Sequence, residues 1–337
     1  MQNKIKIIYM GTPSFAVPSL LALTNDEMFD VSLVVTQPDK PKGRGKKIIY
    51  SPVKEQALKL NLNVFQPENV NDEQSLKRFS KIKPDFIVVA AFGQILSQKL
   101  LDIPKIMPIN IHASLLPKYR GASPVQTAIL NMERFTGITI MQIIKELDAG
   151  DILLSCKIEI SKDETAEDLL KILSLKAANF IVKSIKGLLD KTIIPLAQDH
   201  LQASYTKMFK KEDGKINWNL SGKQIIAHIN AMTPWPCAFT KLGSQTFHIY
   251  KAELFERSDL IKSSSYKPGT IFHCDKKGIH VAIGRKAIKE TGKKADTKID
   301  RNKSLIITEL KVDSGKKMTV NSFLCGNKIS LFSIFES

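Results

Sequence analysis

The first 190 residues alternate apolar, strand-like runs with helix-like segments, and this alternation constrains the fold more than any other feature of the chain. The strand-like runs are rich in Val and Ile and cover residues 4–10, 31–37, 85–92 and 106–112. Helical patterns lie between or after them, at residues 15–24, 52–60, 72–82 and 123–132. Near-continuous apolar strands are buried on both faces, as in parallel sheets flanked by helices. The sequence therefore predicts an α/β fold with a Rossmann-like, doubly wound, mostly parallel sheet.

Two further strand-like runs, at residues 137–144 and 151–160, differ from the first four. A short polar turn separates them, and their β-branched residues alternate along the chain. We expect an antiparallel addition to the sheet there. A long helix is predicted over residues 164–189, with a capping-type start at Asp163 or Thr165.

Beyond residue 190 the pattern changes. Residues 191–204 show no clear period, and after a predicted helix at 221–232 the chain consists of short strand-like runs separated by turn residues. Such runs are typical of a small all-β domain, here an OB-like barrel. We therefore divide the chain into an α/β catalytic domain at 1–190, a linker at 191–206 and a basic β-barrel domain at 207–337.

Several classes of protein are excluded by local sequence. No window approaches about 18 uninterrupted apolar residues, so we expect no membrane span. The N-terminus runs directly into a strand and lacks the features of a signal peptide, which favours a cytoplasmic location. The first turn, at residues 11–14, matches neither a dinucleotide-binding fingerprint nor a Walker loop, so dinucleotide and ATP chemistry lose support.

The four cysteines are Cys156, Cys237, Cys274 and Cys325. They are far apart and form no CxxC pair, which argues against a structural zinc site and against a disulfide framework. We expect isolated reduced thiols and no bound metal.

The chain is strongly basic, with a net charge of +17 and a pI of about 9.6. Residues 205–337 hold 24 Lys and Arg against 12 Asp and Glu, so most of the excess lies in the C-terminal part. Concentrated positive charge favours a polyanionic partner, of which nucleic acid is the usual one. The alternative is a lysine-rich composition that only solvates the surface.

Asn110 and His112 stand two residues apart at the end of the predicted strand 106–112. A period of two puts both side chains on one face, at the end of a parallel strand where open α/β sheets bind ligands. An amide beside an imidazole offers a neutral donor and a proton-transfer group. The pair suits acyl transfer, in which an oxyanion develops while an amine loses a proton. The alternative is a structural histidine.

A basic segment at residues 37–47 follows another strand end. Its Pro and Gly residues forbid a regular helix, and its basic residues are Lys40, Lys42, Arg44, Lys46 and Lys47. We expect a loop beside the active cleft in which Arg44, between two glycines, contacts phosphates. The alternative is a solvated run of charge.

Asp148 lies in the turn at residues 146–151, between the two later strands. A carboxylate next to His112 would orient the imidazole and favour its charged form. The spacing alone gives no proximity between these two residues, and on that basis a surface turn is the better interpretation.

Together these segments resemble the methionyl-tRNA formyltransferases, within the folate-dependent formyltransferase family. The match runs in order over nearly the whole chain, at residues 10–20, 35–47, 51–58, 84–96, 110–129, 136–153, 164–170, 211–218 and 231–239. The resemblance implies that Asn110, His112 and Asp148 are the catalytic trio. It also implies folate contacts from Ser114, Leu115, Leu116 and Pro117.

The Asn-x-His and Asp set is shared by all folate-dependent formyltransferases, so it indicates formyl transfer without naming the acceptor. The basic segment, the TPWP sequence at 233–236 and the basic C-terminal region favour tRNA. We expect a monomeric enzyme that transfers the formyl group of its co-substrate, 10-formyltetrahydrofolate, to the α-amine of initiator methionyl-tRNA. Two alternatives stay open: a formyltransferase for a small amine such as an amino-sugar nucleotide, and an inactive RNA-binding protein on the same scaffold.

Overall fold

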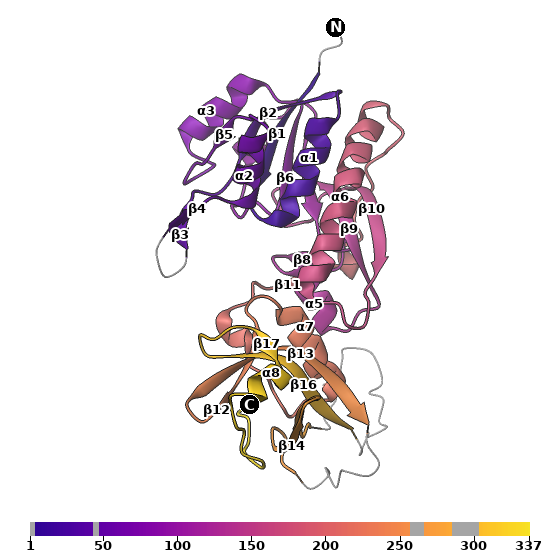
Figure 1. Ribbon diagram of the computed structural model, residues 1–337. Helices are drawn as coiled ribbons and strands as arrows, with labels where there is room; N and C mark the ends of the chain where they lie inside the picture. The colour runs from indigo at the N-terminus through magenta and orange to yellow at the C-terminus, as the bar shows by residue number, and fades with distance from the viewer. Residues whose placement is uncertain (1–3, 43–46, 257–265, 285–302) are drawn as a thin grey trace. The chain divides into compact units, whose positions relative to one another are not determined.

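The computed structural model describes residues 4–42, 47–256, 266–284 and 303–337 (Figure 1). The chain divides into two compact units, each with its own sheet. The first comprises residues 1–124, 135–159 and 169–207, and the second comprises residues 125–134, 160–168 and 208–337. The segment predicted as a linker, 191–206, belongs to the first unit.

A seven-stranded sheet forms the centre of the first unit, in the order β10-β9-β7-β6-β1-β2-β5 (Figure 1). Its strands in chain order are β1 (Ile5–Gly11), β2 (Phe29–Val35), β5 (Val64–Phe65), β6 (Phe86–Ala90), β7 (Met107–His112), β9 (Phe135–Gln142) and β10 (Ile152–Glu159). All neighbours from β5 to β7 are parallel, whereas β9 is antiparallel to both β7 and β10. The mostly parallel sheet and its antiparallel addition are therefore confirmed.

Apolar side chains cover both faces of this sheet. On one face, Ile8 and Met10 of β1 share a buried cluster with Phe79 and Leu100. These two belong to α3 (Glu73–Ile82) and α4 (Gln98–Leu101). Tyr9 points to the opposite face, where its hydroxyl donates to the carbonyl just before α1 (Val17–Asn25), and its burial raises its pKa well above the usual value. Helices thus flank both faces.

The other helices are α2 (Pro52–Lys59), α5 (Pro124–Leu130), α6 (Ala166–Leu189), α7 (Gly222–Met232) and α8 (Val320–Leu324), with short 3-10 turns at η1 (Ser14–Ala16), η2 (His200–Gln202) and η3 (Lys211–Gly214). The helices predicted at 164–189 and 221–232 are confirmed by α6 and α7. Asp72 caps α3 by accepting from the Ser75 amide, which has no partner within the helix. Among the described residues, none of the helices has the length and apolar character needed to cross a membrane.

The second unit contains an antiparallel sheet. Its strands lie in the order β12 (Ala238–Leu242), β13 (Gln245–Glu256), β16 (Lys303–Val312), β15 (Gly278–Val281) and β14 (Ile271–Asp275), and β17 (Met318–Thr319) pairs with β16. Beside this sheet the buried Trp218 donates its indole N–H to Thr240 and stacks on Phe335. The separate C-terminal β region is therefore confirmed. All four cysteines are free thiols, as predicted.

Candidate active site

Strand β7 presents Asn110 and His112 on one face. Asn110 lies between Val89 of β6 and Met141 of β9, and His112 lies opposite Thr139 of β9. Both stand at the carboxyl end of β7, the edge at which open parallel sheets bind ligands. Asn110 is half-buried and His112 is buried. The strand pairing therefore fixes both backbones next to the sheet edge where chemistry is expected.

Asp148 reaches the same place from the turn between β9 and β10. Its φ of +49° lies in the left-handed region, which aspartate tolerates better than most residues. Its Oδ1 accepts from Asn110 Nδ2 at 3.3 Å, and its Oδ2 lies 3.6 Å from His112 Nδ1. Both partners of the His112–Asp148 pair are largely shielded from water, with side chains 7% and 12% exposed. The structure thus places Asp148 beside Asn110 and His112, a proximity that the sequence spacing alone did not give.

Two acceptors face the imidazole of His112. Its Nε2 lies 2.9 Å from the carbonyl oxygen of Tyr119 and therefore donates to it. Its Nδ1 faces the carboxylate of Asp148. The ring is thus held between two acceptors, beside the Asn110 amide.

A glycine holds Asp148 from the other side. The Gly121 N–H donates to Asp148 Oδ2 at 2.8 Å. Gly121 has a φ of +106°, and an added Cβ would lie 2.6 Å from the Thr206 carbonyl oxygen. That carbonyl belongs to β11 (Tyr205–Thr206), which pairs with β8 (Arg120–Gly121). Only glycine fits this backbone and this approach, so the pairing determines how the N–H meets the carboxylate.

The predicted folate-contacting residues Ser114 to Pro117 form a turn anchored to β9. Ser114 and Leu116 are buried. Thr139 Oγ1 donates to the Ser114 carbonyl at 2.7 Å and accepts from the Leu116 N–H at 3.2 Å. Leu115 packs over Gly137, where a Cβ would lie 2.5 Å from its side chain. The turn is therefore held firmly beside His112, and its contact with folate stays a prediction.

Arg120 and Gln198 support the site, and neither was singled out from the sequence. Arg120 is only 2% exposed, and its Nη2 and Nε donate to Gln198 Oε1 at 2.7 and 3.2 Å. Gln198 Nε2 in turn donates to the carbonyls of Asp148 and Gly150 at 2.9 and 2.7 Å. The pair therefore positions the turn that carries Asp148. Gln198 lies in a segment without periodicity, so no sequence signal marked it.

A pocket of about 350 Å³ lies beside β7 and the start of the turn that carries Asp148. Pro108, two residues before Asn110 and so on the same face of the strand, lines it together with Leu101, Ile143 and Ile144. The rest of the lining is polar: Gln98, Asp102, Gln142, Lys145 and Glu146. A pocket lined by both apolar and polar side chains offers a small organic ligand packing surfaces and hydrogen-bonding groups. The pocket is therefore a candidate ligand site next to the strand that carries Asn110.

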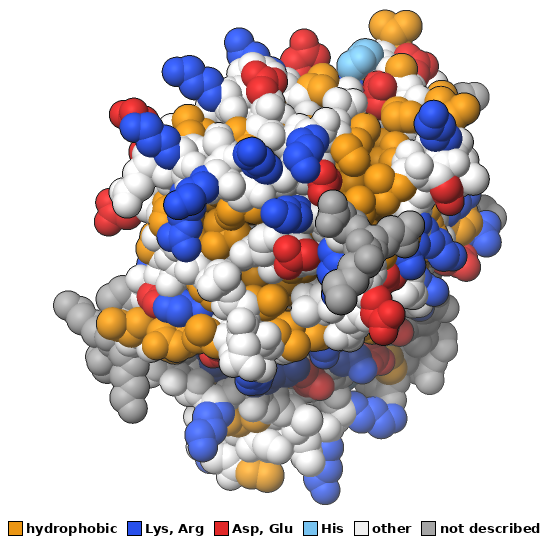
Figure 2. All heavy atoms as spheres, turned by 90° about the horizontal axis from the view of Figure 1, so that it is seen from above, with side chains coloured by type: hydrophobic (Ala, Val, Ile, Leu, Met, Phe, Trp, Pro, Cys, Tyr) orange, Lys and Arg blue, Asp and Glu red, His pale blue; other side chains and the backbone are white. Residues whose placement is uncertain are grey.

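The two ends of the basic segment at 37–47 lie in a pair of short strands. The strands β3 (Lys40–Lys42) and β4 (Lys47–Ile49) pair in antiparallel fashion. The sequence predicted a loop here and not this strand pairing. Arg44 and Lys46 lie outside the described residues. Figure 2 shows basic side chains spread among acidic and apolar ones on the face it presents, without one dominant basic patch.

Asp39 anchors the base of this hairpin. It forms an ion pair with Lys54 and accepts from Gln66 Nε2 at 2.9 Å. Desolvation raises the pKa of Asp39, but the hydrogen bonds from Lys54 and Gln66 outweigh it and hold the pKa below its usual value. The segment is thus tied to α2 at its start.

The family models for "Formyl transferase" and "Formyl transferase, C-terminal domain" match residues 3–185 and 208–328. Together they cover most of the chain, and the first contains the whole of the Asn110, His112 and Asp148 cluster. The chain belongs to the formyl transferase family.

Comparison with curated relatives shows which kind of formyl transferase the chain is. The methionyl-tRNA formyltransferase of Acetivibrio thermocellus is 40% identical over 96% of this chain and 97% of that protein. The methionyl-tRNA formyltransferase of Clostridium acetobutylicum is 42% identical over the same shares. This identity over the full length places the chain among the methionyl-tRNA formyltransferases.

Solved structures of more distant proteins share the fold. WlaRD, a sugar 3N-formyl transferase crystallised in the presence of dTDP and 5-N-formyl-THF, aligns with a TM-score of 0.61 at 21% identity, over 90% of this chain and 97% of that one. HypX from Aquifex aeolicus, in complex with tetrahydrofolic acid, aligns with a TM-score of 0.59 at 15% identity, over 96% of this chain and 47% of that one. At these identities the likeness concerns the fold alone.

Proposed function

We propose that Asn110, His112 and Asp148 catalyse transfer of the formyl group of 10-formyltetrahydrofolate to the α-amine of initiator methionyl-tRNA. The observation that carries this proposal is the convergence of an amide, an imidazole and a shielded carboxylate at the carboxyl end of β7. In the reaction a C–N bond forms between the amine and the formyl carbon, the bond from that carbon to N10 breaks, and a proton passes from the amine to N10.

Each member of the trio has a distinct task in this proposal. Asn110 and the imidazolium of His112 donate to the formyl oxygen as negative charge develops on it, which lowers the barrier if the donors are positioned in advance. Asp148 orients the imidazole and supports its charge. Because both ring nitrogens of His112 already face acceptors, donation to the substrate requires the ring to exchange its contact with the Tyr119 carbonyl.

The 350 Å³ pocket is the proposed place for the folate ring system. Its walls at Leu101, Pro108 and Ile144 suit the faces of a flat heterocycle, and its polar groups suit the ring's amide-like edge. Pro108 and Asn110 share one face of β7, so a ring in the pocket points its substituent towards the trio. The turn at Ser114 to Pro117 is the proposed contact for the remainder of the folate.

Ile144→Trp should raise the KM for 10-formyltetrahydrofolate by about tenfold, because a larger side chain competes with the ring for a pocket of limited size. The KM for methionyl-tRNA should change little. Ile106→Trp is the matched control, since Ile106 is comparably exposed and does not line the pocket. Equal effects of the two variants on the folate KM would reject the pocket assignment.

For the acceptor, we propose that Lys40, Lys42, Arg44, Lys46 and Lys47 bind tRNA phosphates together with the basic C-terminal region. The net positive charge of residues 205–337 supports this. We also propose that the sheet of the second unit closes into an OB-like barrel. Bridges from the C-terminal tail support closure, since Glu336 pairs with Lys241 of β12 and Ile334 pairs with Thr270 next to β14.

Arg44→Ala should weaken use of methionyl-tRNA and reduce the salt slope of tRNA binding by about one, because each phosphate contact releases about one counterion. The measurement is the tRNA dissociation constant over a series of salt concentrations. Lys59→Ala, which removes an exposed charge at the end of α2, serves as the control. A slope identical to that of the parent protein would argue against a phosphate contact at Arg44.

One assay separates this acceptor from the small-amine alternative. The full chain with 10-formyltetrahydrofolate is given methionyl-tRNA, uncharged tRNA or an amino-sugar nucleotide. Formylation of methionyl-tRNA alone is expected, and formylation of the sugar in its place would overturn the proposal. A monomeric state and a cytoplasmic location complete the proposal, and light scattering during gel filtration tests the first of these.

A further inference from the structure

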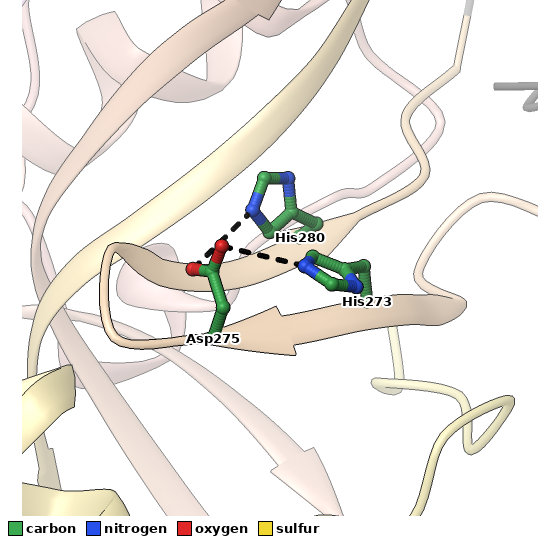
Figure 3. A group of neighbouring side chains, drawn as sticks. All are labelled: His273, Asp275 and His280. Atoms are coloured by element: carbon green, nitrogen blue, oxygen red, sulfur yellow. Dashed lines mark hydrogen bonds and ion pairs between the residues drawn. The ribbon is translucent and has the colours of Figure 1, made fainter. Parts of the chain in front are cut away.

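Two histidines and an aspartate gather on one hairpin of the second unit, far along the chain from the trio. The hairpin consists of β14 and β15, with His273 directly opposite His280 in the strand register. His273 and Asp275 are two residues apart in β14, so their side chains share one face. The cross-strand partner His280 projects on that same face. Figure 3 shows the three side chains converging near the turn.

The donor atoms are spaced as a small metal ion requires. Asp275 Oδ2 lies 3.3 Å from His273 Nε2, and Asp275 Oδ1 lies 3.8 Å from His280 Nε2. One ligand atom from each residue can be chosen so that all lie within 4.8 Å of one another. Tetrahedral zinc with bonds near 2.1 Å separates its ligand atoms by about 3.4 Å. The two Asp–His distances lie within about 0.4 Å of this spacing, and the widest pair has to close by at most about 1.4 Å on an ion.

Neighbouring residues hold the three side chains in position and leave two of them open to solvent. The ring of His280 is buried and packs edge-on against Phe255 and Phe272, which holds its orientation. His273 and Asp275 are each 39% exposed, so an ion can enter from solvent. The Lys277 and Gly278 amides donate to Asp275 Oδ1 at 2.8 and 3.1 Å and hold the carboxylate in place.

We propose that His273, Asp275 and His280 form a binding site for a divalent transition-metal ion, and that Zn²⁺ is the ion it binds best. Imidazole and carboxylate are borderline and hard donors of the kind that zinc accepts, and two His with one carboxylate leave a fourth position for water. Cys274 alternates with the ligands and pairs with Ile279, so its thiol belongs to the opposite face. The bound ion joins β14 to β15.

The test uses the full chain, stripped with a chelator and dialysed. Zn²⁺ is titrated in competition with a chromophoric zinc indicator, and Co²⁺ is used as a spectroscopic probe. One ion per chain is expected at this site, with visible cobalt bands of nitrogen and oxygen ligation. His273→Gln and Asp275→Asn should each weaken zinc binding by at least about 100-fold, because even the outer partners of metal ligands are worth about 10–100-fold.

Two controls keep the outcome clear. Cys274→Ser tests for thiolate ligation, and His248→Gln removes a partly buried histidine of the same sheet that lies outside the cluster. Both should bind zinc as the parent does. The proposal is overturned if the parent binds no more tightly than His273→Gln, if Cys274→Ser loses the ion, or if cobalt shows a thiolate charge-transfer band. Circular dichroism confirms that each variant is folded.

Discussion

His112→Ala and Asn110→Ala should each lower the single-turnover rate of formyl transfer by about 10²–10³-fold, the usual effect of removing one preorganised donor to an oxyanion. The His112 ring is held between the Tyr119 carbonyl and the Asp148 carboxylate, and alanine leaves no hydrogen-bond donor there. Asn110 supplies the neighbouring amide. The affinity for methionyl-tRNA should change little, because neither side chain belongs to the proposed phosphate-binding residues.

The measurement is a rapid-quench assay with saturating 10-formyltetrahydrofolate and methionyl-tRNA. Thermal unfolding of each variant shows whether the fold persists, since His112 is buried and its loss leaves a small void. Parent-like single-turnover rates in either folded variant would remove that residue from the catalytic assignment. A rate loss that scales with loss of folded protein would instead assign the residue a structural role.

The parallel sheet could be predicted because its signal is local and strong. Strands such as β6, with every residue buried, appear as uninterrupted apolar runs, and the helices between them carry their own period. The basic segment at 37–47 was less accessible to such reasoning. Its prolines and glycines predict a loop, but the pairing of Lys40–Lys42 with Lys47–Ile49 depends on hydrogen bonds between strands that are too short to show a period.

In the candidate site, too, neighbours in the sequence could be predicted from their spacing and contacts between distant segments could not. Asn110 and His112 could be paired from the sequence, because a period of two follows from strand geometry. Asp148 could be joined to them only through the family resemblance, since its approach depends on the β9–β10 turn and on a left-handed backbone. Gln198 is more remote still, as it reaches this turn from a segment without periodicity. Contacts made by tertiary folding leave no pattern in one sequence.

The His273, Asp275 and His280 cluster lies outside what the sequence motifs addressed. The sequence prediction of no metal rested on the cysteines, which lack metal-ligand spacing. Two histidines and an aspartate in an H-x-D-x4-H arrangement match no common zinc motif. They meet because the hairpin turn pairs His273 with His280. Strand register, which is invisible in composition, therefore creates the candidate site.

Asp148→Asn should lower kcat by about 10²–10⁴-fold while leaving both KM values nearly unchanged. Asparagine has the same size and tolerates the φ of +49° at this position, so the turn should persist. Its oxygen can still accept from the Gly121 N–H. What disappears is the negative charge facing His112, together with the second oxygen, which accepts from Asn110 Nδ2. In comparable sites the loss of a carboxylate that orients a catalytic imidazole costs up to about 10⁴-fold.

Asp151→Asn is the matched control, because it removes an equal charge three residues away in the same turn without touching the trio. It should retain nearly full activity. If Asp148 acted only through the field of a nearby negative charge, both variants would lose activity to a similar degree. If it served only to hold the turn, Asp148→Asn would lose thermal stability along with its rate. A fall in kcat confined to Asp148→Asn, with unchanged KM values and unchanged unfolding temperature, identifies an interaction made chiefly in the transition state.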